Sequence, residues 1–167
     1  MDTKALMSLS YGMYVLSTMD GNRPTGCIVN SAIQVSSEPP TIAVCVNKNN
    51  WTNACIKIAG SFALSILSED IKPITIGKFG FFSGKNINKF DEFQYELLDK
   101  MPVLKEGICG RIVCKLIGMK ELSTHTLFLG EAIAAEQKGE AKPMTYNYYH
   151  TVIKGKSPES APTYQKS

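Results

Sequence analysis

The 167-residue sequence lacks the features that mark several large classes of protein. No apolar run approaches the length that crosses a membrane, and Met1–Lys4 lacks the apolar segment of a secretory signal. The net charge is only +3 and no Lys/Arg cluster is present, which argues against nucleic-acid binding. No Gly-x-Gly-x-x-Gly pattern follows a strand-like segment, so a Rossmann nucleotide-binding fold is disfavoured.

Paired cysteines are also missing. The five cysteines form an odd set without a Cys-x-x-Cys pair, and they lie in apolar strand-like or helical segments. Small buried thiols fit this placement better than disulfides or zinc ligands. We therefore predict a cytoplasmic protein with free cysteines and no metal site.

What remains is the composition of one ordinary globular domain. Hydrophobic residues make up 44% of the chain and charged residues 20%, and 167 residues suffice for a full-sized core. Residues 154–167 differ, because they are polar and contain two prolines. We predict one domain over residues 1–153 and a tail or linker over 154–167.

Strand-like runs separated by turn residues dominate the pattern. Asp20-Gly21 is a strong hairpin signal between the first two runs, and short helix-like segments interrupt the series. Several antiparallel strands with few helices favour a β-barrel over a βαβ sheet. The predicted strands are 11–18, 24–36, 41–46, 62–67, 102–104, 109–122 and 126–136, and the predicted helices are 3–10, 52–60 and 68–78.

The stretch Thr25–Thr52 organises the rest of the chain. Its first strand sets small polar residues, including Asn30 and Ser31, among Val and Ile, which leaves space and hydrogen-bond donors for a flat polar heterocycle. An apolar strand then leads into an Asn-rich turn and a helix, with Thr52 as the expected N-cap. Free backbone N–H groups at that helix start, beside Lys48, predict an anion site. A solvent-facing polar strand and an ordinary surface turn are the plainer alternatives.

Four segments carry a resemblance to a known family. They are 36–52, with its Ser-x-x-Pro-Pro-x-Ile and Val-Asn-Lys-x-x-x-Thr patterns, Phe81–Gly84 followed by Lys89-Phe90, His125–Ala132, and the Tyr-rich Pro143–His150. Together they resemble the flavin reductase family with the FMN-binding split barrel. The resemblance spans about residues 5–153 and is nearest to the flavin reductase domain of high-molecular-weight rubredoxin and flavoredoxin-like proteins.

The resemblance implies a mainly β fold with short helices, an antiparallel split barrel that is homodimeric and binds FMN, with FAD the less expected flavin. It implies an NAD(P)H oxidoreductase in which NADH or NADPH docks transiently, and electrons pass through FMN to a rubredoxin-like protein, another acceptor or free flavin. No nucleic-acid or membrane partner is expected. Two alternatives stay open: an FMN electron-transfer module reduced by a protein partner, and a non-catalytic flavin- or haem-binding protein on the same barrel.

The resemblance also assigns residues to the flavin site. Asn30, Ser31 and Ala32 match strand positions at the isoalloxazine ring, and the Asn-rich turn matches the phosphate and ribityl site. The loop over 77–88 covers the flavin in the family, although its phenylalanines could equally plug the barrel or a dimer contact. Tyr149 belongs to an aromatic cluster for which interface packing is the alternative role. The expected flavin set is Thr25, Cys27, Val29, Asn30, Ser31, Ala32, Asn47, Lys48, Asn49, Asn50, Trp51, Thr52, Phe82, Ser83, Gly84 and Tyr149.

His125 is the expected catalytic residue. It is one of two histidines and opens a His-x-x-Phe-x-Gly pattern that, in the family, lies at the flavin face where the nicotinamide docks. Many relatives carry Asp before that His, whereas this chain has Thr124, so a carboxylate that orients the imidazole is not expected there. An ordinary surface histidine is the plainer interpretation.

Overall fold

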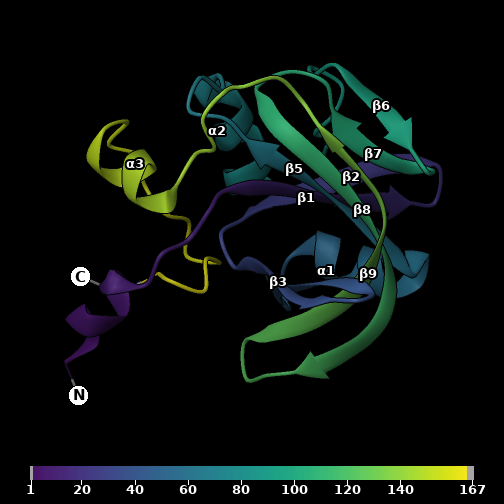
Figure 1. The fold of residues 1–167 in the computed structure, drawn as a ribbon, viewed down its shortest axis with the longest axis horizontal. Coiled ribbons are helices and arrows are strands. Elements are labelled where there is room, and N and C mark those ends of the chain that lie inside the picture. The colour runs from purple at the N-terminus through teal and green to yellow at the C-terminus, as the bar shows by residue number, and fades with distance from the viewer. Residues whose placement is uncertain (1, 165–167) are drawn as a thin grey trace.

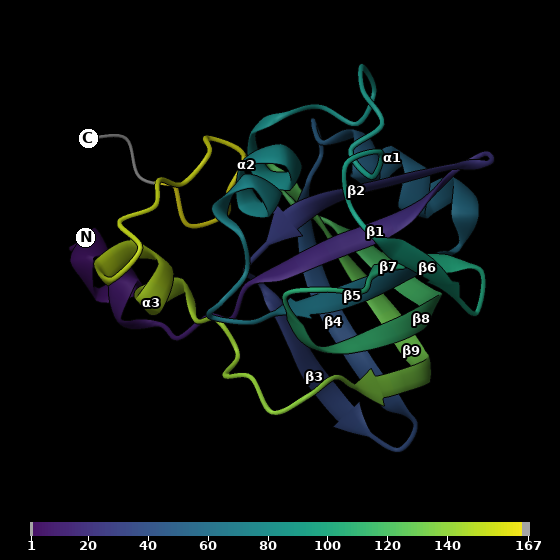
Figure 2. The same cartoon turned by 90° about the horizontal axis from the view of Figure 1, so that it is seen from above.

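In the computed structural model, which describes residues 2–164, seven strands form one antiparallel sheet (Figure 1). The strand order is β2-β1-β5-β8-β9-β4-β3. The two outermost strands, β2 and β3, follow one another in the chain, so the sheet curls round on itself into a split barrel, as predicted (Figure 2). The strands are β1 (Tyr14–Asp20), β2 (Arg23–Val29), β3 (Ala32–Ser37), β4 (Pro40–Asn47), β5 (Ser61–Leu67), β8 (Ile108–Glu121) and β9 (His125–Gln137).

The predicted single strand over 24–36 is wrong, because the chain breaks into β2 and β3 at Asn30-Ser31. Val29 and Ala32 are both buried in the barrel core, at 6% and 7% exposure. Residues three apart in one strand point to opposite faces, so a continuous strand could not bury both. The break carries the chain from one edge of the sheet to the other, and its polar residues lie where the barrel splits.

The barrel interior is an apolar core that includes Leu16, Val44, Leu64 and Phe128, all at most 2% exposed. Gly130 on β9 lies against this core. A Cβ there would stand 2.6 Å from the Phe62 ring, which is why the strand carries glycine at this point.

Helix α1 (Trp51–Ala59) closes one side of the barrel with the fully buried Ile56. The predicted Thr52 cap is wrong: Asn50 is the N-cap, and its side-chain oxygen accepts a hydrogen bond from the Thr52 N–H at 3.1 Å. Gly60 ends the helix as predicted, with a left-handed φ of 67°.

A second core lies beneath α2 (Pro73–Phe81). The helix starts later than predicted and runs through the first part of the expected loop, because Pro73 takes the first helical position. Phe79 is therefore fully buried in this core and is not an exposed loop aromatic. The small hairpin β6 (Tyr95–Leu98) and β7 (Met101–Leu104) packs beside the main sheet.

Two short helices flank the ends of the described chain. The predicted helix over 3–10 is a 3-10 helix, η1 (Thr3–Ser8), and the pattern missed α3 (Tyr146–Thr151), which Thr145 caps. No helix in residues 2–164 is both long and apolar enough to cross a membrane. The C-terminal segment turns back from α3 toward the barrel (Figures 1 and 2).

Candidate functional site

A pocket opens between the ends of β2 and β4, the start of α1, and α2. Its free volume in this structure is about 40 Å³, well below the roughly 300–1,000 Å³ of typical ligand pockets. Its lining is mixed: Cys27, Val29 and Cys45 give apolar contact, while Asn30 and Asn47 bring polar groups to the wall. The remaining wall comes from α3 and from the C-terminal segment.

The start of α1 forms one end of this pocket, at Asn50. Thr25 and Thr52 are 1% and 0% exposed, and neither hydroxyl oxygen has a hydrogen-bond partner among the described residues. Both threonines lie at this end, since Thr25 and Trp51 contact Gly84 together. A buried hydroxyl left unpaired costs about 1–3 kcal/mol. The two hydroxyls therefore indicate a polar ligand group at the helix start.

A buried cation, Lys89, lies near Cys27 of the lining. Its side chain is only 2% exposed, and its ammonium donates to the Phe79 carbonyl oxygen at 3.0 Å. No ion pair within residues 2–164 includes it. Burial lowers the pKa of Lys89 and raises the pKa of the neighbouring Cys27 thiol. An ammonium has three donors, and a buried charge is costly without a partner, so this position favours an anion.

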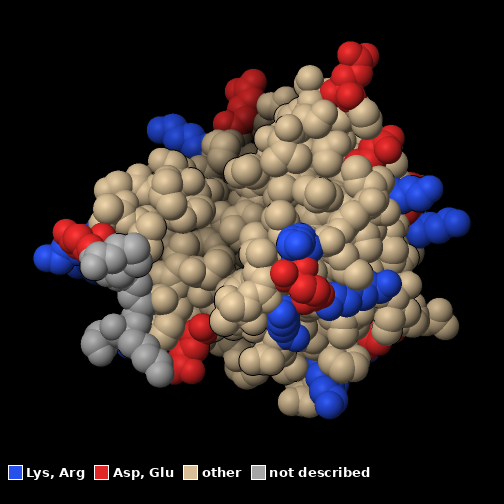
Figure 3. All heavy atoms as spheres, turned by 90° about the horizontal axis from the view of Figure 1, so that it is seen from below, with Lys and Arg blue, Asp and Glu red and all other residues tan. Residues whose placement is uncertain are grey.

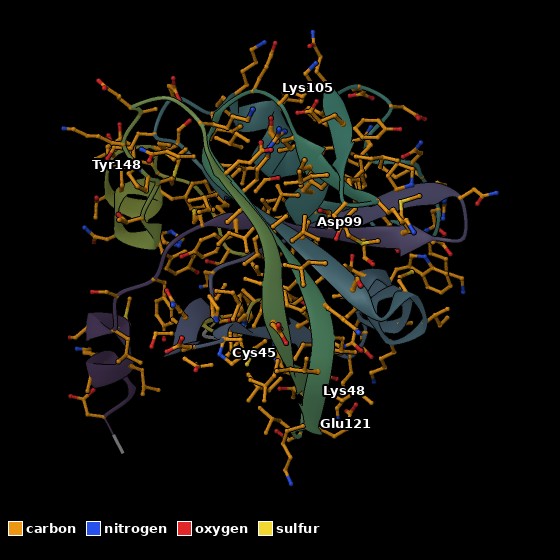
Figure 4. All side chains as sticks on the ribbon, turned by 45° about the vertical axis from the view of Figure 1, so that its right-hand side comes forward. Cys45, Lys48, Asp99, Lys105, Glu121 and Tyr148 are labelled. Atoms are coloured by element: carbon orange, nitrogen blue, oxygen red, sulfur yellow. The ribbon has the colours of Figure 1, made fainter. Side chains whose placement is uncertain are left out.

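Lys48, the cation predicted for the anion site, points elsewhere. Its ammonium lies 3.3 Å from Glu121, which also binds Lys57 at 2.8 Å. Figure 4 shows Lys48 and Glu121 together at the end of the β8–β9 hairpin, below Cys45. The lining of the pocket includes Cys45 but not Lys48.

The opposite end of the pocket carries amide groups at the split of the barrel. Asn30 is 4% exposed; its Nδ2 donates to Thr163 Oγ1 at 2.9 Å, and its Oδ1 has no partner in the described part of the chain. Ser31 Oγ donates to the Cys45 carbonyl at 3.2 Å and lies outside the lining. Ala32 packs into the barrel core. Asn30 is thus the residue of this predicted trio that faces the pocket.

His125 opens β9 directly opposite Asn47 on β4. It is 9% exposed, and Thr124 Oγ1 lies 2.8 Å from its Nδ1, where many relatives were expected to have a carboxylate. Nε2 is buried and has no hydrogen bond of acceptable geometry from any described residue. Burial lowers the pKa of His125, and the nearby Ser160 carbonyl offsets part of that shift. The imidazole is therefore neutral at pH 7, with one ring nitrogen available.

The predicted loop residues divide between two positions. Gly84 lies against Thr25 and Trp51, and Arg23 Nη2 holds the Gly84 carbonyl at 2.9 Å. Phe82 is 57% exposed, with the Lys78 ammonium 5.7 Å from its ring centre. The loop therefore covers the start of α1 through its backbone, while Phe82 faces solvent.

The structure brings together only part of the predicted flavin set. Cys27, Val29, Asn30, Asn47, Asn50 and Tyr149 line the pocket. Thr25, Trp51, Thr52 and Gly84 cluster at the helix start next to it. Outside the lining lie Ser31, Ala32, Lys48, Asn49, Phe82 and Ser83.

A family model described as a flavin reductase like domain matches residues 6–156. The chain belongs to the flavin reductase family. It is 38% identical over 165 residues to the high molecular weight rubredoxin of Moorella thermoacetica, covering 98% of this chain and 72% of that protein. It is 36% identical over 168 residues to the ferric-chelate reductase (NAD(P)H) of Archaeoglobus fulgidus, covering 100% and 99% of the two chains.

The fold is that of other flavin reductases. The solved NADH:FAD oxidoreductase SgcE6 of Streptomyces globisporus superposes with a TM-score of 0.77 at 24% identity, covering 84% of this chain and 83% of that one. Membership of the family makes the protein an oxidoreductase, in agreement with the sequence prediction.

Three features in or near this pocket do not stand out as site elements in the sequence. Lys89 belongs to the Lys-Phe likeness, and a lone lysine carries no signal of burial. Tyr146 was recognised only as part of an aromatic cluster. The polar segment 156–162 was predicted as a tail, yet it lines the pocket. In each case the residue takes its position through contacts with residues far away in the chain, which local sequence patterns do not reveal.

Proposed function

We propose that this flavin reductase family member is an FMN-dependent NAD(P)H oxidoreductase. The observation that carries the proposal is the buried Lys89 ammonium, without a carboxylate partner in the described chain. It lies near Cys27, which also neighbours Thr52 and its unpaired hydroxyl at the start of α1. A phosphate at this position would pair the ammonium and accept hydrogen bonds from groups at the helix start.

The residues present fit FMN along the pocket. Lys89, Thr25 and Thr52 would hold the phosphate, with the first N–H groups of α1 behind them. Asn30 and Asn47 would meet the edge of the ring system, since both bring side-chain amides to the lining. FMN, when bound, supplies the two-electron acceptor for hydride transfer, while the barrel orients it and limits access of water to one face.

FMN is favoured over FAD by the closed end of the site. Gly84 packs against Thr25 and Trp51, and the Lys85 ammonium lies 5.7 Å from the centre of the Trp51 ring. A phosphate held at the start of α1 would therefore meet this loop, which leaves little room there for an attached adenylate. Family relatives are named for both flavins, an FMN reductase (NADH) in Agrobacterium fabrum and an NADH-dependent FAD reductase in Streptomyces globisporus.

We assign His125 to the nicotinamide. Its neutral imidazole lies opposite Asn47 on β4. Nε2 has no hydrogen bond of acceptable geometry in the described chain, and the nearest acceptor is the Ser160 carbonyl of the C-terminal segment. A hydrogen bond from this nitrogen to the nicotinamide carboxamide would orient the donor. Because hydride transfer needs no protein acid, the role is positioning.

The acceptor we propose is a rubredoxin-like protein, with another acceptor or free flavin as the alternatives. Support comes from the alignment of 98% of this chain with 72% of a protein named high molecular weight rubredoxin. A reducing, cytoplasmic setting agrees with the free cysteines of the described chain.

We also propose a homodimer. Ile33 and Val35 on β3 are 63% and 50% exposed, and Ile33, Ala43 and Leu129 lie in one cross-strand row on the outer face of the sheet. Figure 3 shows that the uncharged surface on this side of the molecule lies mainly left of and above its centre, beside a cluster of Lys/Arg and Asp/Glu side chains. Apolar strand surfaces of this kind are typical of subunit contacts. Sedimentation of Ile33→Glu against the unaltered chain tests the assignment, and a dimer of unchanged stability in the variant would refute it.

The function is tested by anaerobic absorption titration. The purified protein is loaded with FMN, and NADH or NADPH is added while flavin absorption at its visible maximum is followed. Bleaching supports the reductase and identifies the donor. Bound flavin that both nucleotides leave oxidised would point to an electron-transfer module fed by a protein, and failure to bind FMN would refute the proposal.

A further inference from the structure

We propose that the segment Gly155–Thr163, here called the strap, occupies the flavin pocket and must be displaced before flavin binds. The inference rests on the proposed function, because it concerns the same pocket. The proposal adds that the strap competes with flavin for the pocket. The affinity for flavin, and the rate at which bound and free flavin exchange, then depend on the strap as well as on the pocket.

The strap contacts the polar groups that the flavin and the nicotinamide are expected to use. Thr163 Oγ1 accepts from Asn30 Nδ2 at 2.9 Å, and the Ser160 carbonyl accepts from Asn47 Nδ2 at 3.3 Å. The same carbonyl lies close enough to His125 to raise its pKa. Strap residues Pro158, Ala161 and Pro162 supply apolar lining. A flavin ring that takes the Nδ2 donors of Asn30 and Asn47 would compete with these contacts.

A cluster on α3 anchors the strap. The Gly155 N–H donates to the Tyr149 carbonyl at 3.0 Å, and the Tyr149 hydroxyl donates to the Lys156 carbonyl at 3.2 Å. The Tyr146 hydroxyl bonds Ser157 Oγ and accepts from Thr163 Oγ1 at 3.0 Å. These contacts pull both ends of the strap onto one helix, so they hold it as a closed loop over the pocket.

Gly155 is needed at the point where the strap meets α3. A Cβ there would collide with the ring of Tyr149, and Gly155 does not itself line the pocket. A side chain at this position therefore pushes Gly155 and the Tyr149 ring apart and loosens the strap where it begins. Because Tyr149 lines the pocket, a second variant at Thr163, which is not part of the lining, separates loosening of the strap from movement of that ring.

The strap is held weakly enough to be displaced. None of its residues belongs to a buried apolar cluster, and each described strap residue keeps partial or full exposure. The preceding Lys154 has a left-handed φ of 58°, a conformation that costs a non-glycine residue free energy. When a site is open only part of the time, the apparent dissociation constant rises by the inverse of the open fraction. Loosening the strap should therefore tighten flavin binding.

The test measures FMN binding by quenching of flavin fluorescence in the full chain and in point variants. Gly155→Ala is the main variant, and Thr163→Val is the second, because it removes the hydroxyl that bridges Asn30 and Tyr146. Glu159→Ala is the matched control, since this exposed strap residue makes no side-chain hydrogen bond or ion pair in the described structure. We expect each loosened variant to bind FMN about fivefold more tightly, with a faster association rate, and the control to be unchanged.

Hydrogen exchange gives a second measurement on the unaltered protein. Saturating FMN should increase exchange of the Gly155 amide, whose bond to Tyr149 breaks when the strap leaves. Weaker or equal FMN affinity in both loosened variants would refute the competition between strap and flavin, and would show that the strap is a fixed wall of the site. Failure of every variant, control included, to bind FMN would instead refute the proposed function together with the competition.

Discussion

Replacing Lys89 by Met tests the phosphate site directly. The Lys89 ammonium is buried, has one protein acceptor and lacks an ion pair in the described chain, so its remaining donors are available to a ligand anion. Hydrogen bonds to charged groups contribute about 1.5–3 kcal/mol, and about 1.4 kcal/mol is a tenfold change in affinity. Lys89→Met should therefore weaken FMN binding by roughly 10- to 100-fold.

Riboflavin separates charge recognition from a change in the shape of the pocket. Riboflavin lacks the phosphate, so its affinity should be nearly equal in Lys89→Met and in the unaltered protein. Both ligands are measured by fluorescence titration in one buffer, and circular dichroism confirms that the variant is folded. The predicted signature is loss of the preference for FMN over riboflavin.

Lys48→Met is the matched control, because the sequence alone assigns the anion site to Lys48. Its ammonium pairs with Glu121 at the end of the hairpin, so removing it should change FMN affinity less than about twofold. The reasoning fails if Lys48→Met loses FMN affinity while Lys89→Met keeps it. It fails equally if both variants lose riboflavin and FMN in parallel.

Three further predictions concern the positioning residue and the barrel. His125→Gln should slow the reduction of bound FMN by NADH or NADPH about tenfold in stopped-flow measurements, because one hydrogen bond to the nicotinamide is lost. The affinity for FMN should be unchanged. An unchanged reduction rate would show that His125 does not position the nicotinamide. Burial holds the folded-state pKa of His125 below its usual 6.5, so on acidification the unfolded state binds a proton first. The free energy of unfolding should therefore fall as the pH drops through 6.5 toward the folded-state pKa. Denaturant unfolding at pH 7 and pH 5 should show a smaller loss of stability in His125→Gln than in the unaltered protein, and equal losses would contradict this. Gly130→Ala places a Cβ 2.6 Å from Phe62 and 2.7 Å from Cys114, which should cost about 1–3 kcal/mol by overpacking, whereas Gly77→Ala, with open space around it, should not lower Tm.

The order of strands was predictable because each run is a local pattern bounded by turn residues. The break between β2 and β3 was also present in the sequence, although it was not recognised. Val29 and Ala32 are both apolar at a spacing of three, which no single strand can bury on one face. Polar residues between them were interpreted as a feature of one strand, when they mark the exchange of sheet edges.

The cation of the proposed phosphate site could not be assigned from local sequence. Lys48 stands in the predicted turn, whereas Lys89 is far away in the chain and is buried against the Phe79 ring, whose centre lies 4.9 Å from that of Phe90. Which of the two lysines is buried and unpaired is decided by side-chain direction and by packing in a second core. Both are tertiary properties that the spacing of residues along the turn does not contain.

The C-terminal segment shows that composition can identify a polar segment without indicating where in the fold that segment packs. A stretch this poor in apolar residues cannot form a core of its own, which is the physical basis for predicting a tail. It can, however, satisfy hydrogen-bonding groups that another part of the chain leaves open, and Asn30 and Asn47 offer such groups to Thr163 and Ser160. Under the proposed function, the same amides would meet a polar cofactor. The polarity that would make the pocket a flavin site therefore also makes it a docking site for the protein's own polar strap, so competition between the two follows from one cause.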